Sequence, residues 1–206
     1  AVEDAVILPF NDSAAAEKIL RARAKNLAAI IVEPLMGNCA GIEPAPGFLE
    51  FIRAKCDEYG IVFILDEVKT GFRVARGGAQ ELYGILPDLA TYAKSLGNGY
   101  PIAALGGRRD IMDIIGRGVA QGGTYCGNIP GTAAADATLE LLETQPILDI
   151  MAERGKRLMA GIDQILTEAN IPHALMGLPQ MFGFVLGSDR APTNYRDALD
   201  TNMKLY

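Results

Sequence analysis

The stretch Ile61-Val62-Phe63-Ile64-Leu65-Asp66-Glu67 decides the fold of this 206-residue chain more clearly than any other. Its five consecutive apolar residues are typical of a strand that is buried on both faces of a parallel sheet. The helical pattern before it opens at Pro46-Gly47 and ends at Gly60, and residues 28–33 form another apolar run before that helix. We expect this run to be a strand buried on both faces as well. Strand, helix and strand in this order predict a right-handed parallel crossover.

Helix and strand patterns also alternate outside this unit, which indicates an α/β fold. Ser13 is the predicted N-cap of a first helix, and Pro146 opens a long amphipathic helix that ends before Pro172. A domain boundary is expected near residue 145. The remaining predicted elements are strands over 89–93, 102–105 and 181–186 and helices over 131–142 and from 195 onward.

The composition limits the classes of function. Half of the residues are apolar, and the formal net charge of −6 disfavours binding to nucleic acids or to a membrane surface. The three cysteines, Cys39, Cys56 and Cys126, form no C-x-x-C pair, and His173 is the single histidine. No zinc ligand set is therefore recognisable, no metal site is predicted, and reduced thiols in the cytoplasm are the simplest interpretation.

Asp66 ends the decisive strand, where ligands of open α/β sheets bind. The acid could equally cap the next turn or be solvated. An apolar strand ending in Asp66-Glu67 is also similar to the magnesium-binding strand of P-loop nucleotide hydrolases. That interpretation requires a G-x-x-x-x-G-K-[ST] loop, which the sequence lacks.

Lys94 follows the predicted strand at 89–93 and precedes the turn Gly97-Asn98-Gly99. Most lysines are solvated, but one held between a strand and a tight turn can be partly desolvated and so nucleophilic. Lys94 follows Asp66 by 28 residues, one helix-and-strand unit, which would place the two on nearby strand ends. A lysine amine that forms an imine and a carboxylate that faces the pyridine nitrogen are the minimum pair for pyridoxal catalysis.

The loop 121–130 contains Gly122-Gly123-Thr124 and leads into a helix. Its backbone N–H groups and the threonine hydroxyl suit a phosphate near a helix N-terminus. An ordinary glycine-rich loop that caps the helix explains the same residues equally well.

Taken together, these segments resemble the class III pyridoxal phosphate-dependent aminotransferases of fold type I, and within them the members similar to glutamate-1-semialdehyde aminomutase. The similarity runs over essentially the whole chain. The resemblance implies part of a large three-layer α/β/α domain with a mixed, mostly parallel sheet over residues 1–145, and the start of a small α+β domain over 146–206. It is carried by residues 32–38, 65–73, 87–89, 93–99, 123–124 and 127–130.

The resemblance also implies roles for individual residues. Lys94 would form the Schiff base with pyridoxal 5′-phosphate and move the proton, and Asp66 would pair with the pyridinium nitrogen. Val68 would pack against the ring, and Asn38 would lie near its phenolic oxygen. Thr124, with Gly123, would bind the phosphate of the cofactor in the neighbouring subunit of a homodimer. The implied activity is amino transfer between an amine or amino acid and a carbonyl compound.

Two positions depart from the family pattern. Lys69 stands where many relatives have Gln or Met, and Ile129 is inserted between Asn128 and Pro130. The main phosphate-binding loop of the family would lie before Ala1 and much of the small domain after Tyr206, so this chain alone is expected to bind the cofactor poorly. Intramolecular amino transfer by an aminomutase, a nucleotide-binding hydrolase and a catalytically silent scaffold are the alternatives.

Overall fold

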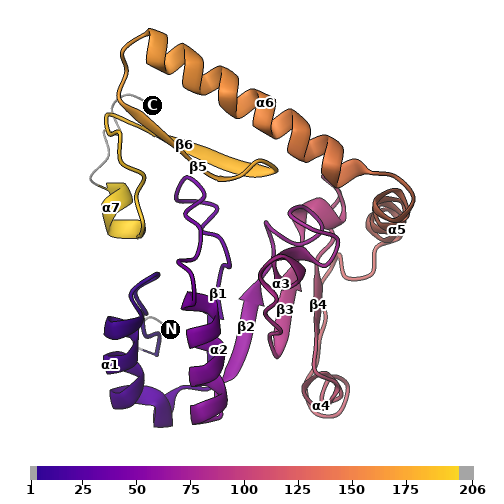
Figure 1. The fold of residues 1–206 in the computed structure, drawn as a ribbon. Helices are drawn as coiled ribbons and strands as arrows, with labels where there is room; N and C mark the ends of the chain where they lie inside the picture. The colour runs from indigo at the N-terminus through magenta and orange to yellow at the C-terminus, as the bar shows by residue number, and fades with distance from the viewer. Residues whose placement is uncertain (1–3, 200–206) are drawn as a thin grey trace.

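The computed structural model describes residues 4–199. Its main feature is a four-stranded sheet in the order β1-β2-β3-β4, in which β1, β2 and β3 are parallel and β4 is antiparallel to β3 (Figure 1). This arrangement is the predicted mixed, mostly parallel sheet. The strands are β1 (Ala29–Val32), β2 (Val62–Asp66), β3 (Leu89–Tyr92) and β4 (Ala104–Gly107).

Helices lie beside this sheet. Strands β5 (His173–Leu178) and β6 (Met181–Leu186) form a separate antiparallel hairpin. The longest helix, α6 (Ile147–Glu168), runs along the hairpin in Figure 1. The others are α1 (Ser13–Arg23), α2 (Phe48–Tyr59), α3 (Gly78–Tyr83), α4 (Arg109–Met112), α5 (Ile129–Thr144) and α7 (Tyr195–Leu199), with 3₁₀ turns at Ala24–Asn26 and at Lys94–Leu96 (η2).

The core forms where α1 and α2 pack against β1 and β2. The crossover β1–α2–β2 is parallel as predicted, and α2 ends at Gly60, whose φ of 66° lies in the left-handed region that glycine adopts freely. Burial of a large apolar side chain contributes about 1.5–3 kcal/mol. The buried cluster comprises Leu20, Ile30, Phe48, Leu49, Ile52, Cys56, Ile61, Phe63, Leu65 and Ile85.

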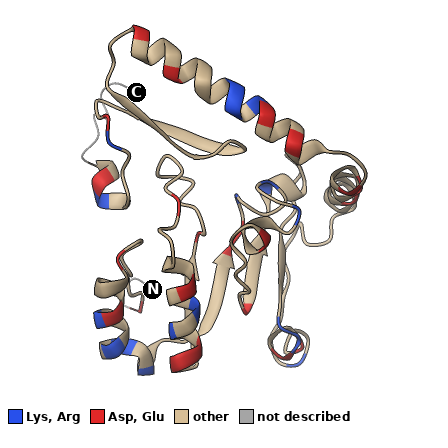
Figure 2. Cartoon of the chain, viewed as in Figure 1, with Lys and Arg blue, Asp and Glu red and all other residues tan. Residues whose placement is uncertain are grey.

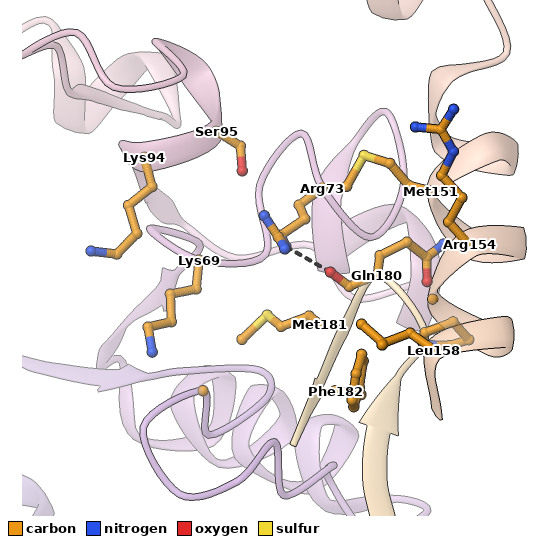
Figure 3. A pocket seen from close by; sticks show the side chains of 13 residues that line it. Lys69, Arg73, Lys94, Ser95, Met151, Arg154, Leu158, Gln180, Met181 and Phe182 are labelled. Atoms are coloured by element: carbon orange, nitrogen blue, oxygen red, sulfur yellow. Dashed lines mark hydrogen bonds between the residues drawn. The ribbon is translucent and has the colours of Figure 1, made fainter. Parts of the chain in front are cut away.

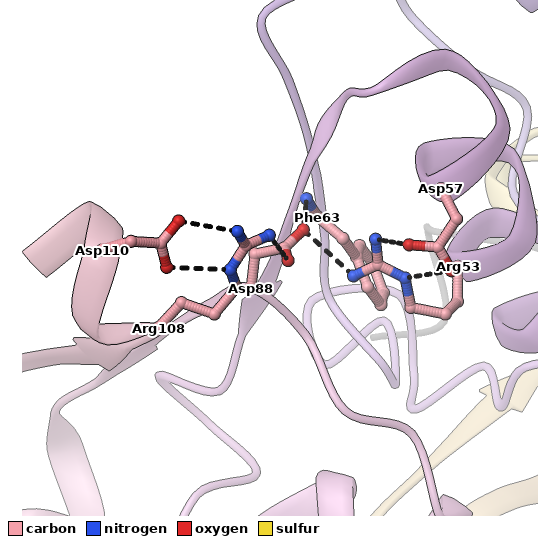
Figure 4. Close-up of polar contacts among 6 residues, drawn as sticks. All are labelled: Arg53, Asp57, Phe63, Asp88, Arg108 and Asp110. Atoms are coloured by element: carbon pink, nitrogen blue, oxygen red, sulfur yellow. Dashed lines mark hydrogen bonds and ion pairs between the residues drawn. The ribbon is translucent and has the colours of Figure 1, made fainter.

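Asp88 ties three elements of the sheet domain together (Figure 4). Its carboxylate accepts hydrogen bonds from Phe63 N–H of β2 at 2.7 Å, from Arg53 of α2 at 3.0 Å and from Arg108, after β4, at 2.9 Å. The Asp88 residue is 6% exposed. Burial opposes ionisation, but these hydrogen bonds and the charge of Arg53 outweigh it and hold the pKa of Asp88 below its usual value.

The β5–β6 hairpin packs closely on two neighbours. Neither strand contains a Lys, Arg, Asp or Glu residue (Figure 2). A Cβ at Gly155 of α6 would overlap the carbonyl oxygen of Pro179 in the hairpin turn. A Cβ at Gly183 would likewise overlap the backbone of Ala40, in the loop after β1. These glycines therefore let the hairpin approach both α6 and the loop that carries Asn38.

Several local expectations were wrong. Asp12, and not Ser13, is the N-cap of α1, because the Asp12 carboxylate accepts the Ala15 N–H at 2.9 Å. Strand β1 is not buried on both faces, since it is an edge strand of the described sheet and Ile31 is 61% exposed. The sequence also gave no prediction of β5. Of the helix expected from residue 195 onward, Tyr195–Leu199 is helical and the rest lies outside the described residues.

Candidate active site

A cavity of about 510 Å³ lies where the loop after β2, the η2 turn, helix α6 and the β5–β6 turn meet (Figure 3). It therefore joins segments that are far apart in the sequence. The lining residues are Gly37, Lys69, Arg73, Lys94, Ser95, Met151, Arg154, Gly155, Leu158, Pro179, Gln180, Met181 and Phe182.

Lys94 is the first residue of η2 and is separated from the end of β3 only by Ala93. Its φ is +42°, which is unusual for a residue with a side chain. The turn is closed by hydrogen bonds from the N–H groups of Gly97 and Asn98 to the Lys94 carbonyl oxygen, at 3.2 and 2.9 Å. Within residues 4–199, the Lys94 Nζ makes no hydrogen bond or ion pair. A strained, rigid backbone thus presents an unpaired amine to the cavity.

Asp66 is the last residue of β2. Its Oδ1 accepts hydrogen bonds from Val68 N–H at 3.0 Å and from the Thr91 hydroxyl at 3.2 Å. The Oδ2 atom accepts none from the part of the chain that the structure describes. Asp66 pairs in register with Thr91, three residues before Lys94, so Asp66 and Lys94 follow the carboxyl ends of adjacent parallel strands.

Glu67 faces a different part of the molecule. Its side chain is fully buried, and its two oxygens accept four hydrogen bonds. The donors are the Thr70 hydroxyl, the backbone N–H groups of Ala79 and Gln80, and the Gln80 side-chain amide, at 2.7–3.2 Å. Glu67 therefore fixes the start of α3 and has no free oxygen for a magnesium ion. The nucleotide-hydrolase alternative therefore loses one of its two proposed magnesium ligands, Glu67.

Lys69 lines the cavity and contacts Asn38, which is not among the lining residues. The Nζ of Lys69 donates a hydrogen bond to Asn38 Oδ1 at 2.5 Å, and Lys69 lines the cavity together with Lys94. Lys69, which departs from the family pattern, is therefore one of the residues that line the cavity. Val68, between Asp66 and Lys69, is half-buried.

Gly123 and Thr124 lie apart from this group. Both are exposed, in the loop before α5, and neither lines the cavity. Asn128 caps α5, since its Oδ1 accepts the Gly131 N–H at 2.7 Å. The additional residue, Ile129, becomes the first residue of α5 and is 82% exposed.

Sequence reasoning missed Arg73, which lines the cavity, and Thr91, which contacts Asp66. Arg73 Nε donates a hydrogen bond to the carbonyl oxygen of Gln180 at 2.8 Å and so connects the loop after β2 to the hairpin turn. Thr91 orients Asp66, as described above. Thr91 could have been suggested from the expected pairing of its strand with the strand that ends in Asp66. No local sequence pattern indicates that Gln180 lies beside Arg73.

The described residues contain neither a cluster of metal-ligating side chains nor a membrane-spanning helix. Among residues 4–199, no group of three or more His, Cys, Asp or Glu side chains is placed to hold a metal ion. No helix in this range is long and apolar enough to cross a membrane.

The comparisons with known proteins agree on one family. Residues 2–201 match the sequence profile of the family described as aminotransferase class-III. Similar solved structures include an omega-transaminase from Sphaerobacter thermophilus, which is 32% identical, with a TM-score of 0.82 over 94% of this chain and 44% of that one.

Two other structures are 26% identical to the chain and cover 97% of it. They are a glutamate-1-semialdehyde-aminomutase from Pseudomonas aeruginosa PAO1, with a TM-score of 0.84 over 46% of that protein, and a β-phenylalanine aminotransferase from Variovorax paradoxus, with a TM-score of 0.82 over 47%. The chain spans less than half the length of these structures. With the profile matched over nearly its whole length, the chain belongs to the class III aminotransferase family.

Proposed function

We propose that the intact protein carrying this chain is a pyridoxal 5′-phosphate-dependent aminotransferase, which moves an amino group between an amine or amino acid and a carbonyl acceptor. The proposal is carried by one observation. Lys94 Nζ and Asp66 Oδ2, at the ends of adjacent parallel strands, both lack a hydrogen-bond partner among the described residues. Membership of the family supports it, as do the names of the similar structures, two of which are transaminases or aminotransferases.

The residues present fit this cofactor. A primary amine can hold its aldehyde, and a carboxylate with a free oxygen can face its ring nitrogen. Lys94 and Asp66 would supply these two groups. When bound, pyridoxal phosphate supplies an aldehyde carbon that takes up amines and a cationic ring that withdraws electrons from the substrate α-carbon.

Asp66 would keep the ring nitrogen protonated. The Val68 N–H and the Thr91 hydroxyl fix the carboxylate through Oδ1, which leaves Oδ2 to accept the hydrogen bond of the pyridinium N–H. A carboxylate held in this way is already oriented and does not have to reorganise during turnover. The Val68 side chain would pack against one face of the ring.

Lys94 would be both the attachment point and the general acid–base. Its strained backbone places Nζ at the cavity, and the lack of a partner among the described residues leaves the amine available. The same Nζ would act as the base that removes a proton from the substrate α-carbon and as the acid that returns it. Proton transfer by a positioned side chain typically contributes 10²–10⁴-fold in rate.

Asn38, Gly123 and Thr124 complete the proposed set of cofactor-binding residues. Asn38 would lie near the phenolic oxygen of the ring. Gly123 and Thr124 are exposed and do not line the cavity that contains Lys94. They would contact the phosphate of the cofactor in the neighbouring subunit of a homodimer. We also propose a cytoplasmic enzyme whose large domain includes residues 1–145 and whose small domain starts in 146–206.

Intramolecular amino transfer is the second candidate. It is favoured by the TM-score of 0.84 to the glutamate-1-semialdehyde-aminomutase, although at 26% identity. Lys94 and Asp66 would serve both reactions, so these two residues do not distinguish them.

The test is an amino-transfer assay on the full-length protein with and without an external keto acid. An aminotransferase converts at most about one equivalent of an amino donor per site without a keto acid and needs the keto acid for repeated turnover, whereas an aminomutase turns over glutamate 1-semialdehyde without one. Both activities should be lost in Lys94→Ala. A Lys94→Ala protein with wild-type turnover would refute the proposal.

A further inference from the structure

The cavity is basic although the chain is acidic. Four of its thirteen lining residues are cations, Lys69, Arg73, Lys94 and Arg154, and none is Asp or Glu. The whole chain carries a formal net charge of −6. Positive charge is therefore gathered in the one place where Lys94 is presented, and such a cavity attracts an anion.

Lys69 is held in place more firmly than a solvated lysine. A Cβ at Gly37 would overlap both Lys69 Cδ and Met181 Cε, so the lysine stem packs against the loop after β1 and beside the hairpin turn. At the far end of this stem, Nζ donates a hydrogen bond to Asn38 Oδ1. Both the stem and the head group of Lys69 thus have fixed neighbours, and the ammonium group is directed to one place.

The charge of Lys69 is not neutralised by these neighbours. Asn38 is uncharged, and no acid within residues 4–199 forms an ion pair with Lys69. An ammonium group has three donors, and one is used. Arg73 is in a similar state, because its described hydrogen bond, from Nε to the Gln180 carbonyl oxygen, leaves the two terminal nitrogens for another acceptor.

Figure 3 shows how these cations lie around the cavity. The side chains of Lys94 and Lys69 extend in the same direction from neighbouring turns, and the Arg73 guanidinium lies between the hairpin turn and Lys94. The Arg154 guanidinium is on the opposite side, against α6. A ligand that reacts at Lys94 therefore has Lys69 as a neighbouring, unpaired cation.

We propose that Lys69 binds the carboxylate of the substrate, so that amino acids and oxo acids, and not amines without a carboxylate, are the substrates that this enzyme prefers. The inference rests on the proposed amino-transfer function. It assigns Lys69 as a specificity-determining residue, with Asn38 and Gly37 as the residues that position its ammonium group. A carboxylate suits Lys69 because it can accept the two remaining N–H groups in charge-assisted hydrogen bonds.

The test measures binding of propionate and of its neutral isostere, propionamide, to the full-length protein loaded with pyridoxal phosphate. Ligand-detected NMR titration gives the two dissociation constants in wild type, Lys69→Met, Lys69→Arg and Lys18→Met. Methionine keeps an unbranched stem that can pack against Gly37 but lacks the charge. Lys18 is an exposed lysine of α1 without an ion pair among the described residues, so its variant controls for the loss of one positive charge.

We expect wild type to bind propionate at least about ten-fold more tightly than propionamide, the contribution of one charge-assisted hydrogen bond. Lys69→Met should lose most of this preference, while Lys69→Arg and Lys18→Met should keep it. The cofactor content, read from the absorbance of the bound chromophore, should be unchanged in all four proteins.

Three results would overturn the inference. The first is an equal affinity of wild type for propionate and propionamide, and the second is a preference for propionate that survives in Lys69→Met. The third is a loss of cofactor from Lys69→Met, which would assign the lysine to the cofactor phosphate instead. A wild-type protein that takes up no pyridoxal phosphate would contradict the proposed function itself, and the cofactor absorbance distinguishes that failure from the other three.

Discussion

Asp66 and Glu67 are adjacent in the sequence, yet their carboxylates contact different elements. Successive side chains at the end of a strand point to opposite faces of the sheet. Asp66 consequently keeps one oxygen without a partner among the described residues, while Glu67 is buried under the start of α3 with both oxygens used. The sequence indicated that an acid mattered here, but only the hydrogen-bond partners distinguish Asp66, the proposed cofactor ligand, from Glu67, which is structural.

Replacing Asp66 with Asn tests its proposed electrostatic role. The amide keeps the shape and can still accept the Val68 N–H, but it no longer carries the charge that holds a proton on the ring nitrogen. We expect kcat to fall by about 100- to 1,000-fold, the usual effect of removing one preorganised electrostatic contact. Steady-state kinetics on the full-length protein measures it, and Asp66→Asn with a wild-type kcat would exclude the role.

Asp88 gives a prediction about stability. Its carboxylate is nearly buried and bonded to Arg53 and Arg108, so removing it leaves the charge of Arg53 without its inner partner. Asp88→Ala should lower the free energy of unfolding at pH 7 by about 3 kcal/mol, the lower end for a buried pair because Arg108 is 55% exposed. Urea denaturation measures the loss. Asp57→Asn, which alters the other, exposed partner of Arg53, is the control and should cost less than about 1 kcal/mol.

The pH dependence follows from the lowered pKa of Asp88. A carboxyl whose pKa is lower in the folded protein stabilises the fold above its unfolded pKa, about 3.9, and loses this contribution as the pH falls through the folded value. The difference in unfolding free energy between wild type and Asp88→Asn should therefore be largest at neutral pH and shrink below about pH 4. A difference that grew toward acid pH would contradict this account.

At the scale of elements, α6 and the β5–β6 hairpin depend on one glycine. A methyl group at Gly155 would overlap the Pro179 carbonyl oxygen, whereas one at Gly161, also in α6, would meet nothing within 4 Å. Gly155→Ala should lower the free energy of unfolding by about 1–3 kcal/mol through overpacking. Gly161→Ala should raise it by up to about 1 kcal/mol through helix propensity. Equal effects of the two substitutions in urea denaturation would be inconsistent with the close packing.

The elements that the sequence predicted well are those specified by neighbouring residues. The run of apolar residues at 61–65, the glycine at 60 and the proline at 146 are local signals, and β2, the end of α2 and the start of α6 follow them. Strand β5 was missed because it alternates weakly and depends on pairing with β6. The exposure of Ile31 was missed because nothing within β1 shows that it is an edge strand.

At the scale of the whole molecule, the candidate site was predicted only in part. Asp66 and Lys94 could be paired because one helix-and-strand unit separates them and β2 and β3 are neighbours. The cavity also needs residue 37, residue 69 and the hairpin turn at 179–182, which no local pattern connects. Thr124 does not line this cavity, and the cofactor phosphate that we propose it binds belongs to the neighbouring subunit.

Mixed dimers test that proposed sharing. If Thr124 serves the neighbouring subunit, a dimer of one Lys94→Ala chain and one Thr124→Ala chain contains one site with both residues intact. Such hybrids of the full-length protein should regain about half of the wild-type activity, because each residue comes from the chain in which it is unmodified. If Thr124 instead serves its own subunit, every site in the hybrid is damaged and the activity should stay at or below that of the Thr124→Ala homodimer.

The most direct test of the central claim, that Lys94 holds the cofactor, is chemical trapping. The full-length protein is incubated with pyridoxal phosphate, reduced with borohydride, digested and mapped by mass spectrometry. We predict about one pyridoxyl group per chain on the peptide containing Lys94, retained in Lys69→Met and absent in Lys94→Ala. A stoichiometric modification at another lysine, or none in the wild-type protein, would contradict the account.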